Sequence, residues 1–113
     1  MQQTVAMTKI VQDILNIVKY HYKMNLDENS FNYSRFVTHL RYFAQRLMQK
    51  ELNSAEDDFL YEQVRSKYHE AYSCTEKIEA YLRKAHNSHL SKDEKVYVTL
   101  HIHRVTKRNE LCN

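Results

Sequence analysis

The sequence predicts an all-α fold, and three features support that prediction. The chain of 113 residues contains neither glycine nor proline. Most tight turns and hairpins depend on these residues, and proline interrupts helices, so their absence favours helices over sheets. Apolar residues also recur at helical spacing in five segments joined by short polar links. We therefore expect one domain, residues 1–113, built as an antiparallel five-helix bundle.

The first two helices are each marked by an apolar stripe. The first is expected from about Thr4 to Met24, with Asn25 at its end. The second is expected to follow the capping cluster Asp27-Glu28-Asn29-Ser30 and to end near Gln49. In each helix the apolar residues have the spacing of one helical face. They are Ile10, Ile14, Ile17 and Val18 in the first helix, and Phe36, Leu40, Phe43 and Leu47 in the second.

Capping signals and new runs of apolar residues at helical spacing predict three further helices. Helix three is expected from Ala55 to about Lys67, after a polar run with acidic residues at its start. A break near Tyr68-His69 then separates it from helix four, with one long kinked helix as the alternative. Helix four is expected to end at Asn87-Ser88-His89. Ser91 and Glu94 fit a capping box at the start of helix five, which we expect from Lys92 to about Arg108.

Composition argues against several classes of protein. The net charge of +3 arises from 17 basic and 14 acidic residues that are interspersed, so no basic tract indicates a nucleic-acid footprint. Apolar runs are too short for a membrane span or a signal peptide, which predicts a cytoplasmic protein that does not enter membranes. Without glycine a phosphate-binding loop cannot form, and other catalytic motifs are missing. We expect neither an enzyme nor a cofactor.

Two histidines carry most of the functional information. His39 is expected at the edge of an apolar helical arc with Arg35 and Arg46 nearby, and His101 lies on a similar arc with Arg104 and Arg108 one and two turns away. A neutral imidazole is a nucleophile, and guanidinium groups bind phosphate, so each site could accept a phosphoryl group. The alternative is that each histidine is a hydrogen-bonded core or interface residue.

A metal site is not expected. His101 and His103 are two residues apart and point to opposite sides of a helix, so they cannot bind one ion. His86 and His89 have suitable spacing but no third ligand, and His103 is expected on a solvated face. Cys74 and Cys112 are far apart in sequence and are expected to be inert.

The segments around the two histidines also carry a family resemblance. Residues 32–40 (NYSRFVTHL) with 43–47 (FAQRL), and 90–94 (LSKDE) with 97–104 (YVTLHIHR), resemble the phosphotransferase-system (PTS) regulation domain, or PRD, of BglG/LicT-type bacterial transcription antiterminators. The resemblance extends over nearly the whole chain. It implies a homodimeric five-helix bundle in which His39 and His101 are the phosphoacceptors.

Details of the motif resemble the second of the two PRD copies in such antiterminators. Thr38 precedes His39, and Gln45-Arg46 ends the motif, as in that copy. The resemblance implies that the chain is a fragment of a longer protein, which contacts RNA only through a separate N-terminal domain. It also implies that the phosphocarrier HPr donates the phosphate and favours an active dimer, while sugar-specific enzyme II components act chiefly on the first copy. One departure is His69, where many relatives have proline.

Two alternatives remain open at this point. A PRD within a PTS-controlled transcription activator would use the same chemistry to control a different effector domain. A plain helical dimerisation module would use no phosphate chemistry and would tolerate replacement of both histidines.

Overall fold

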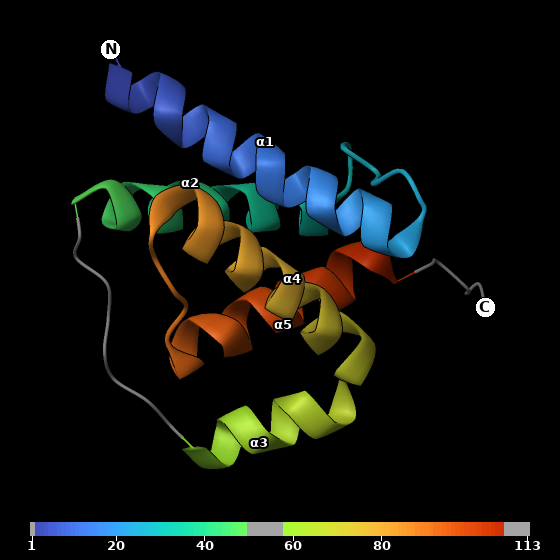
Figure 1. Cartoon of the computed structure of the whole chain (residues 1–113). Helices are drawn as coiled ribbons and strands as arrows, with labels where there is room; N and C mark the ends of the chain where they lie inside the picture. The colour runs from blue at the N-terminus through green and yellow to red at the C-terminus, as the bar shows by residue number, and fades with distance from the viewer. Residues whose placement is uncertain (1, 50–57, 108–113) are drawn as a thin grey trace.

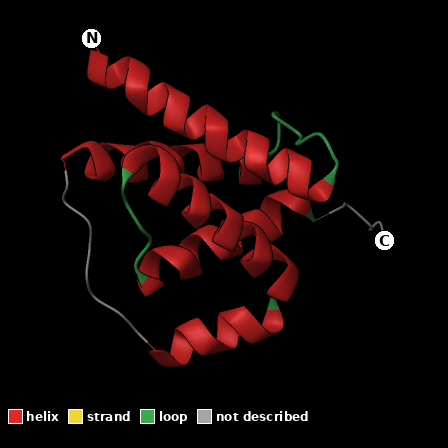
Figure 2. Ribbon diagram, in the orientation of Figure 1, coloured by secondary structure: helices red, strands yellow, loops and turns green. Residues whose placement is uncertain are grey.

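Five helices make up the described part of the chain, residues 2–49 and 58–107 of a computed structural model (Figures 1 and 2). This arrangement confirms the predicted all-α class. The helices are α1 (Gln2–Tyr22), α2 (Phe31–Gln49), α3 (Asp58–Lys67), α4 (His69–His86) and α5 (Lys92–Thr106).

The helices form an antiparallel bundle around α5. The chain runs in opposite directions along α1 and α2, and again along α4 and α5 (Figure 1). Helix α1 packs on α2 and α4, whereas α5 packs on α2, α3 and α4. Among the described helices, none is both long and apolar enough to cross a membrane.

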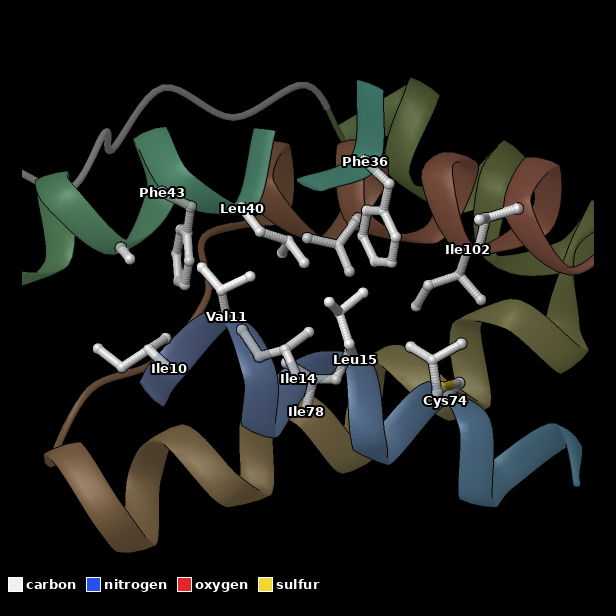
Figure 3. Packing of buried hydrophobic residues seen from close by; sticks show 14 of the residues in the cluster. Ile10, Val11, Ile14, Leu15, Phe36, Leu40, Phe43, Cys74, Ile78 and Ile102 are labelled. Carbon is white, nitrogen blue, oxygen red and sulfur yellow. The ribbon is translucent and has the colours of Figure 1, made fainter. Parts of the chain in front are cut away.

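Apolar faces of four helices meet in one core (Figure 3). The stripes predicted for the first two helices are confirmed, except that Ile17 lies at the edge of the core and is only partly buried. Burial raises the pKa of the Cys74 thiol to about 12, which agrees with an inert packing role. The innermost residues include Ile10, Ile14 and Val18 of α1, Phe36, Leu40 and Phe43 of α2, Ile78 and Leu82 of α4, and Ile102 of α5.

The turn between α1 and α2 follows the polar signals of the sequence. Helix α1 ends at Tyr22, two residues before its predicted end, because Lys23 adopts a left-handed conformation with φ of 54°. Ser30 caps α2, since its Oγ accepts a hydrogen bond of 3.0 Å from the backbone N–H of Tyr33. Asp27 supports the same turn by accepting from the N–H of Asn29.

The predicted break between helices three and four is confirmed. Helix α3 ends at Lys67, Tyr68 leaves helical geometry with φ of −117° and ψ of 52°, and α4 begins at His69. The alternative prediction of one long kinked helix is therefore wrong. The predicted start of helix three, Ala55, lies outside the described residues.

Helix α3 buries one residue and makes polar contacts with α5 and α4. Val64 is the residue that it buries. Asp58 pairs with Lys92 of α5 at 2.7 Å, and the hydroxyl oxygens of Tyr61 and Tyr72 are 2.5 Å apart. A helix of ten residues with one buried side chain depends on such contacts for its position.

The link between α4 and α5 shows why the next boundaries fall where they do. Asn87 is left-handed, with φ of 53°, and its N–H donates to the carbonyl of Leu82, which ends α4. Ser91 caps α5 by accepting from the N–H of Glu94 at 3.1 Å, so this half of the predicted capping box is confirmed. The other half is wrong, because the carboxylate of Glu94 binds Arg46 instead. Helix α5 ends at Thr106, before the predicted Arg108.

Two buried hydroxyl groups join α4 to α5. Thr75 and Thr99 are fully buried, and their Oγ1 atoms are 2.8 Å apart. Thr75 also donates to the carbonyl of Ala71 at 3.1 Å. Each threonine thus satisfies the other inside an apolar layer.

Replacing one of these threonines should cost more than replacing both. Thr75→Val leaves the Thr99 hydroxyl buried without its partner, and we expect the free energy of unfolding to fall by about 1–3 kcal/mol. Thr75→Val/Thr99→Val removes both polar groups at nearly constant shape and should recover most of that loss. Urea unfolding followed by circular dichroism measures both. A double variant no more stable than the single one would contradict this account.

Candidate functional site

The two predicted histidine sites form one site in the folded chain. His39 on α2 and His101 on α5 lie with ring centroids 4.9 Å apart and ring planes inclined by 31°. We call these two residues the histidine pair. Phe36 stacks on His101 at 5.7 Å, and Tyr97 lies 5.9 Å from His39. The aromatic surroundings and the packing of α2 on α5 hold both rings at one helix–helix contact.

Both members of the histidine pair are biased towards the neutral form. Burial lowers the pKa of His39, and the charge of Arg46 lowers it further. Burial is also the main reason that the pKa of His101 falls to about 4, followed by the effects of His39, Arg104 and Arg35. At neutral pH each ring therefore keeps a nitrogen lone pair that can act as a nucleophile.

A buried carboxylate completes the site. The side chain of Glu94 is 5% exposed, and its Oε2 accepts a hydrogen bond of 2.5 Å from Nη2 of Arg46. Its Oε1 faces Nε2 of His39 at 3.8 Å. Burial disfavours the charged form of His39, so Arg46 is the group that balances the charge of Glu94.

Sequence reasoning missed the role of Glu94 by assigning it to a helix cap. A signal was nevertheless present in the spacing. His39 and Arg46 are seven residues apart, as are Glu94 and His101, so each pair lies on one face of its helix, two turns apart. When α2 and α5 pack together, Arg46 meets Glu94 and His39 meets His101.

The predicted arginines occupy different environments. Arg35 is exposed, and its guanidinium carbon lies 5.4 Å from the centroid of the Phe31 ring. Arg104 is exposed on α5, and both residues are close enough to His101 to lower its pKa. Arg46 is already paired with Glu94. Arg108 lies outside the described residues.

The expectation that His103 lies on a solvated face was wrong. Its ring lies 4.4 Å from that of Tyr68, at the junction of α3 and α4, and it is half-buried. The neighbouring positions Thr99 and Thr106 are buried. The reason is that α3 and α4 cover a face of α5 that the sequence pattern alone leaves polar.

His86 has a structural role. Nε2 of His86 lies 3.0 Å from the hydroxyl of Tyr81, which donates to Asp13. Within residues 2–49 and 58–107, no three His, Cys, Asp or Glu side chains gather in a way that could hold a metal ion.

Comparison with known proteins places this site in a family. The model of the PRD domain matches residues 12–105. The transcription antiterminator LicT of Bacillus subtilis (strain 168) is 47% identical over 108 residues, which are 96% of this chain and 39% of LicT. The beta-glucoside operon antiterminator of Dickeya chrysanthemi is 41% identical over 111 residues, which are 98% of this chain and 38% of that protein.

A more distant relative shows the same pattern of coverage. Protein GlcT of Staphylococcus aureus (strain JH9) is 28% identical over 108 residues, or 96% of this chain and 38% of GlcT. The chain thus spans about two fifths of the length of these relatives. Since the matched family model covers both helices of the histidine pair and most of the chain, this protein belongs to the PRD domain family.

Proposed function

We propose that this chain is the regulatory phosphoacceptor domain of a transcription antiterminator. In this proposal HPr phosphorylates His39 and His101, and phosphorylation controls dimerisation of the domain. Dimerisation in turn controls RNA binding by a separate N-terminal domain of the same protein. The observation that carries the proposal is the contact between His39 and His101, with ring centroids 4.9 Å apart, in a chain of the PRD family.

The environment of the histidine pair suits phosphoryl transfer from another phosphohistidine. The lone pair of a neutral ring attacks phosphorus, the bond from phosphorus to the donor ring breaks, and the donor ring keeps that electron pair. Arg35 and Arg104 lie near His101 and would offset the charge of the incoming phosphoryl group. We assign Arg46, together with Arg108, a supporting role at the interface, since Arg46 already balances Glu94.

Phosphorylation would change the balance of charge where α2 meets α5. A phosphoryl group adds a charge of about −1.5 to −2. Near His39 that charge would repel Glu94 and compete for Arg46, whose pairing now joins the two helices. A rearrangement of this contact is a physical route from phosphate uptake to a change in the dimer interface.

The wider architecture belongs to the same proposal. We place the chain, residues 1–113, as the second PRD copy of a cytoplasmic protein that also contains an RNA-binding domain and a first PRD copy, on which sugar-specific enzyme II acts. Two relatives above 40% identity, LicT and the beta-glucoside operon antiterminator, are named as antiterminators, which favours this class over a transcription activator.

Phosphopeptide mapping tests the acceptor residues. After incubation with enzyme I, HPr and phosphoenolpyruvate, mass spectrometry should find acid-labile phosphate on peptides that contain His39 and His101. His39→Ala and His101→Ala should each lose the phosphate at the replaced position. His103→Ala is the matched control, because His103 is a half-buried histidine of α5 outside the pair, and it should retain both phosphates. Phosphate uptake by the double variant His39→Ala/His101→Ala would contradict the assignment of these two residues as phosphoacceptors.

The titration of His101 tests the neutral state that the chemistry needs. NMR of its ring C–H signals should give a midpoint near 4 in the folded chain, compared with about 6.5 in urea. Between these values the unfolded chain binds more protons, so the free energy of unfolding should fall as the pH is lowered from about 6.5 towards 4. His101→Gln should weaken this pH dependence. A folded-state midpoint near 6.5 would contradict the account.

Sedimentation equilibrium tests the link to dimerisation. Phosphorylation by HPr should tighten the dimer by about fivefold or more, the lower end of typical coupling between two sites. The double variant His39→Gln/His101→Gln, treated in the same way, should show no such change. Equal dissociation constants before and after stoichiometric phosphorylation would instead favour a plain dimerisation module.

A further inference from the structure

The buried carboxylate beside His39 has a consequence for the phosphorylation site, and this inference depends on the proposed function. Nε2 of His39 and Oε1 of Glu94 are both enclosed, and neither has a hydrogen-bond partner. These two atoms lie 3.8 Å apart. Two buried polar atoms that face each other, one of them anionic, set the preferred position of the proton on the imidazole ring.

Arg46 determines which carboxylate oxygen meets the ring. Its guanidinium group binds Oε2 at 2.5 Å and leaves Oε1 towards His39. An anionic oxygen is stabilised by a facing N–H group and repelled by a facing lone pair. Neutral His39 therefore favours the tautomer with hydrogen on Nε2, which leaves the lone pair on Nδ1.

Burial within the ring also argues against attack by Nε2. The side chain of His39 is 20% exposed, but its Nε2 is enclosed. The exposed part of the side chain thus belongs to its other atoms, and a phosphoryl donor cannot reach Nε2 without displacing the surrounding groups.

We propose that Glu94 is a positioning residue that holds the proton of His39 on Nε2 and thereby directs the phosphoryl group to Nδ1. In this step the Nδ1 lone pair forms the new bond to phosphorus. The bond between phosphorus and the donor imidazole breaks, and its electron pair stays on the donor ring, which carries a proton on its other nitrogen and leaves as neutral imidazole. His39 keeps its Nε2 proton, and Glu94 stabilises the positive charge that develops on the ring.

Glu94→Gln tests the proposal because it should reverse the polarity at His39. The amide oxygen would take the place of Oε2 and accept from Arg46, so the NH₂ group would face Nε2 of His39. We expect two-bond ¹H–¹⁵N correlations to show hydrogen on Nε2 in the native chain and on Nδ1 in the variant. Phosphorylation of His39 by HPr should slow by about tenfold, or about 1.4 kcal/mol.

The phosphohistidine isomer gives a readout that a purely structural role would not change. After transfer from HPr, ³¹P NMR of the native chain should find Nδ1-phosphohistidine at position 39, and the residual product of Glu94→Gln should shift towards the Nε2 isomer. Glu79→Gln is the matched control, since Glu79 is also a buried carboxylate but binds Lys95 and the N–H of Leu90. It should leave the tautomer and isomer of His39 unchanged.

The outcomes separate this inference from the proposed function. Phosphate on Nε2 of His39 in the native chain, or hydrogen on its Nδ1, would overturn the role of Glu94 and leave His39 as an acceptor. Absence of phosphate on His39 would overturn both. Melting curves of Glu94→Gln identify a folded variant, and tautomer measurements on the native chain decide the question if the variant is unfolded.

Discussion

The contact between α2 and α5 is the constraint on which the site depends. It carries two pairings at once, Arg46 with Glu94 and His39 with His101, separated by two helical turns. Glu94 is buried, whereas the Arg46 side chain is 34% exposed. Such a partly buried ion pair often adds little net stability, because removing charge from water costs about as much as the attraction returns. Its contribution here is geometric. A sliding of either helix by one turn would leave the carboxylate of Glu94 unpaired, so the ion pair selects the register in which the two imidazole rings meet.

The fold was largely predictable because each helix carries its own local signals. Ser30 and Ser91 cap their helices as the sequence predicts, and the apolar stripes around Ile14 and Phe36 enter the core. Those signals depend on spacings of a few residues, and here apolar pattern and capping point to the same helices. Small errors remain at helix ends such as Tyr22, where a left-handed Lys23 stops the helix without a glycine.

The site was predictable only in part, because it depends on how helices cross. The residues of the histidine pair were identified on their own helices, but nothing local reveals that positions 39 and 101 lie side by side. Glu94 was read as a capping residue because its sequence neighbours fit that motif, whereas the carboxylate binds a residue 48 positions away. The prediction that His103 lies on a solvated face was wrong for the same reason. Its surroundings are set by the junction of α3 and α4, and helical periodicity contains no information about that junction.

The helices differ in how much apolar surface they bury, and α3 buries less than the four helices of the core. It buries Val64 and is otherwise held by polar groups such as Asp58 and Tyr61, whereas the other four helices share the apolar core. Opening α3 exposes little apolar surface and therefore costs less free energy than unfolding the whole domain. Its amide protons should thus exchange with solvent ahead of those of the core helices, and added salt should speed that exchange by screening the Asp58–Lys92 pair. We therefore expect α3 to open before the four helices that share the apolar core.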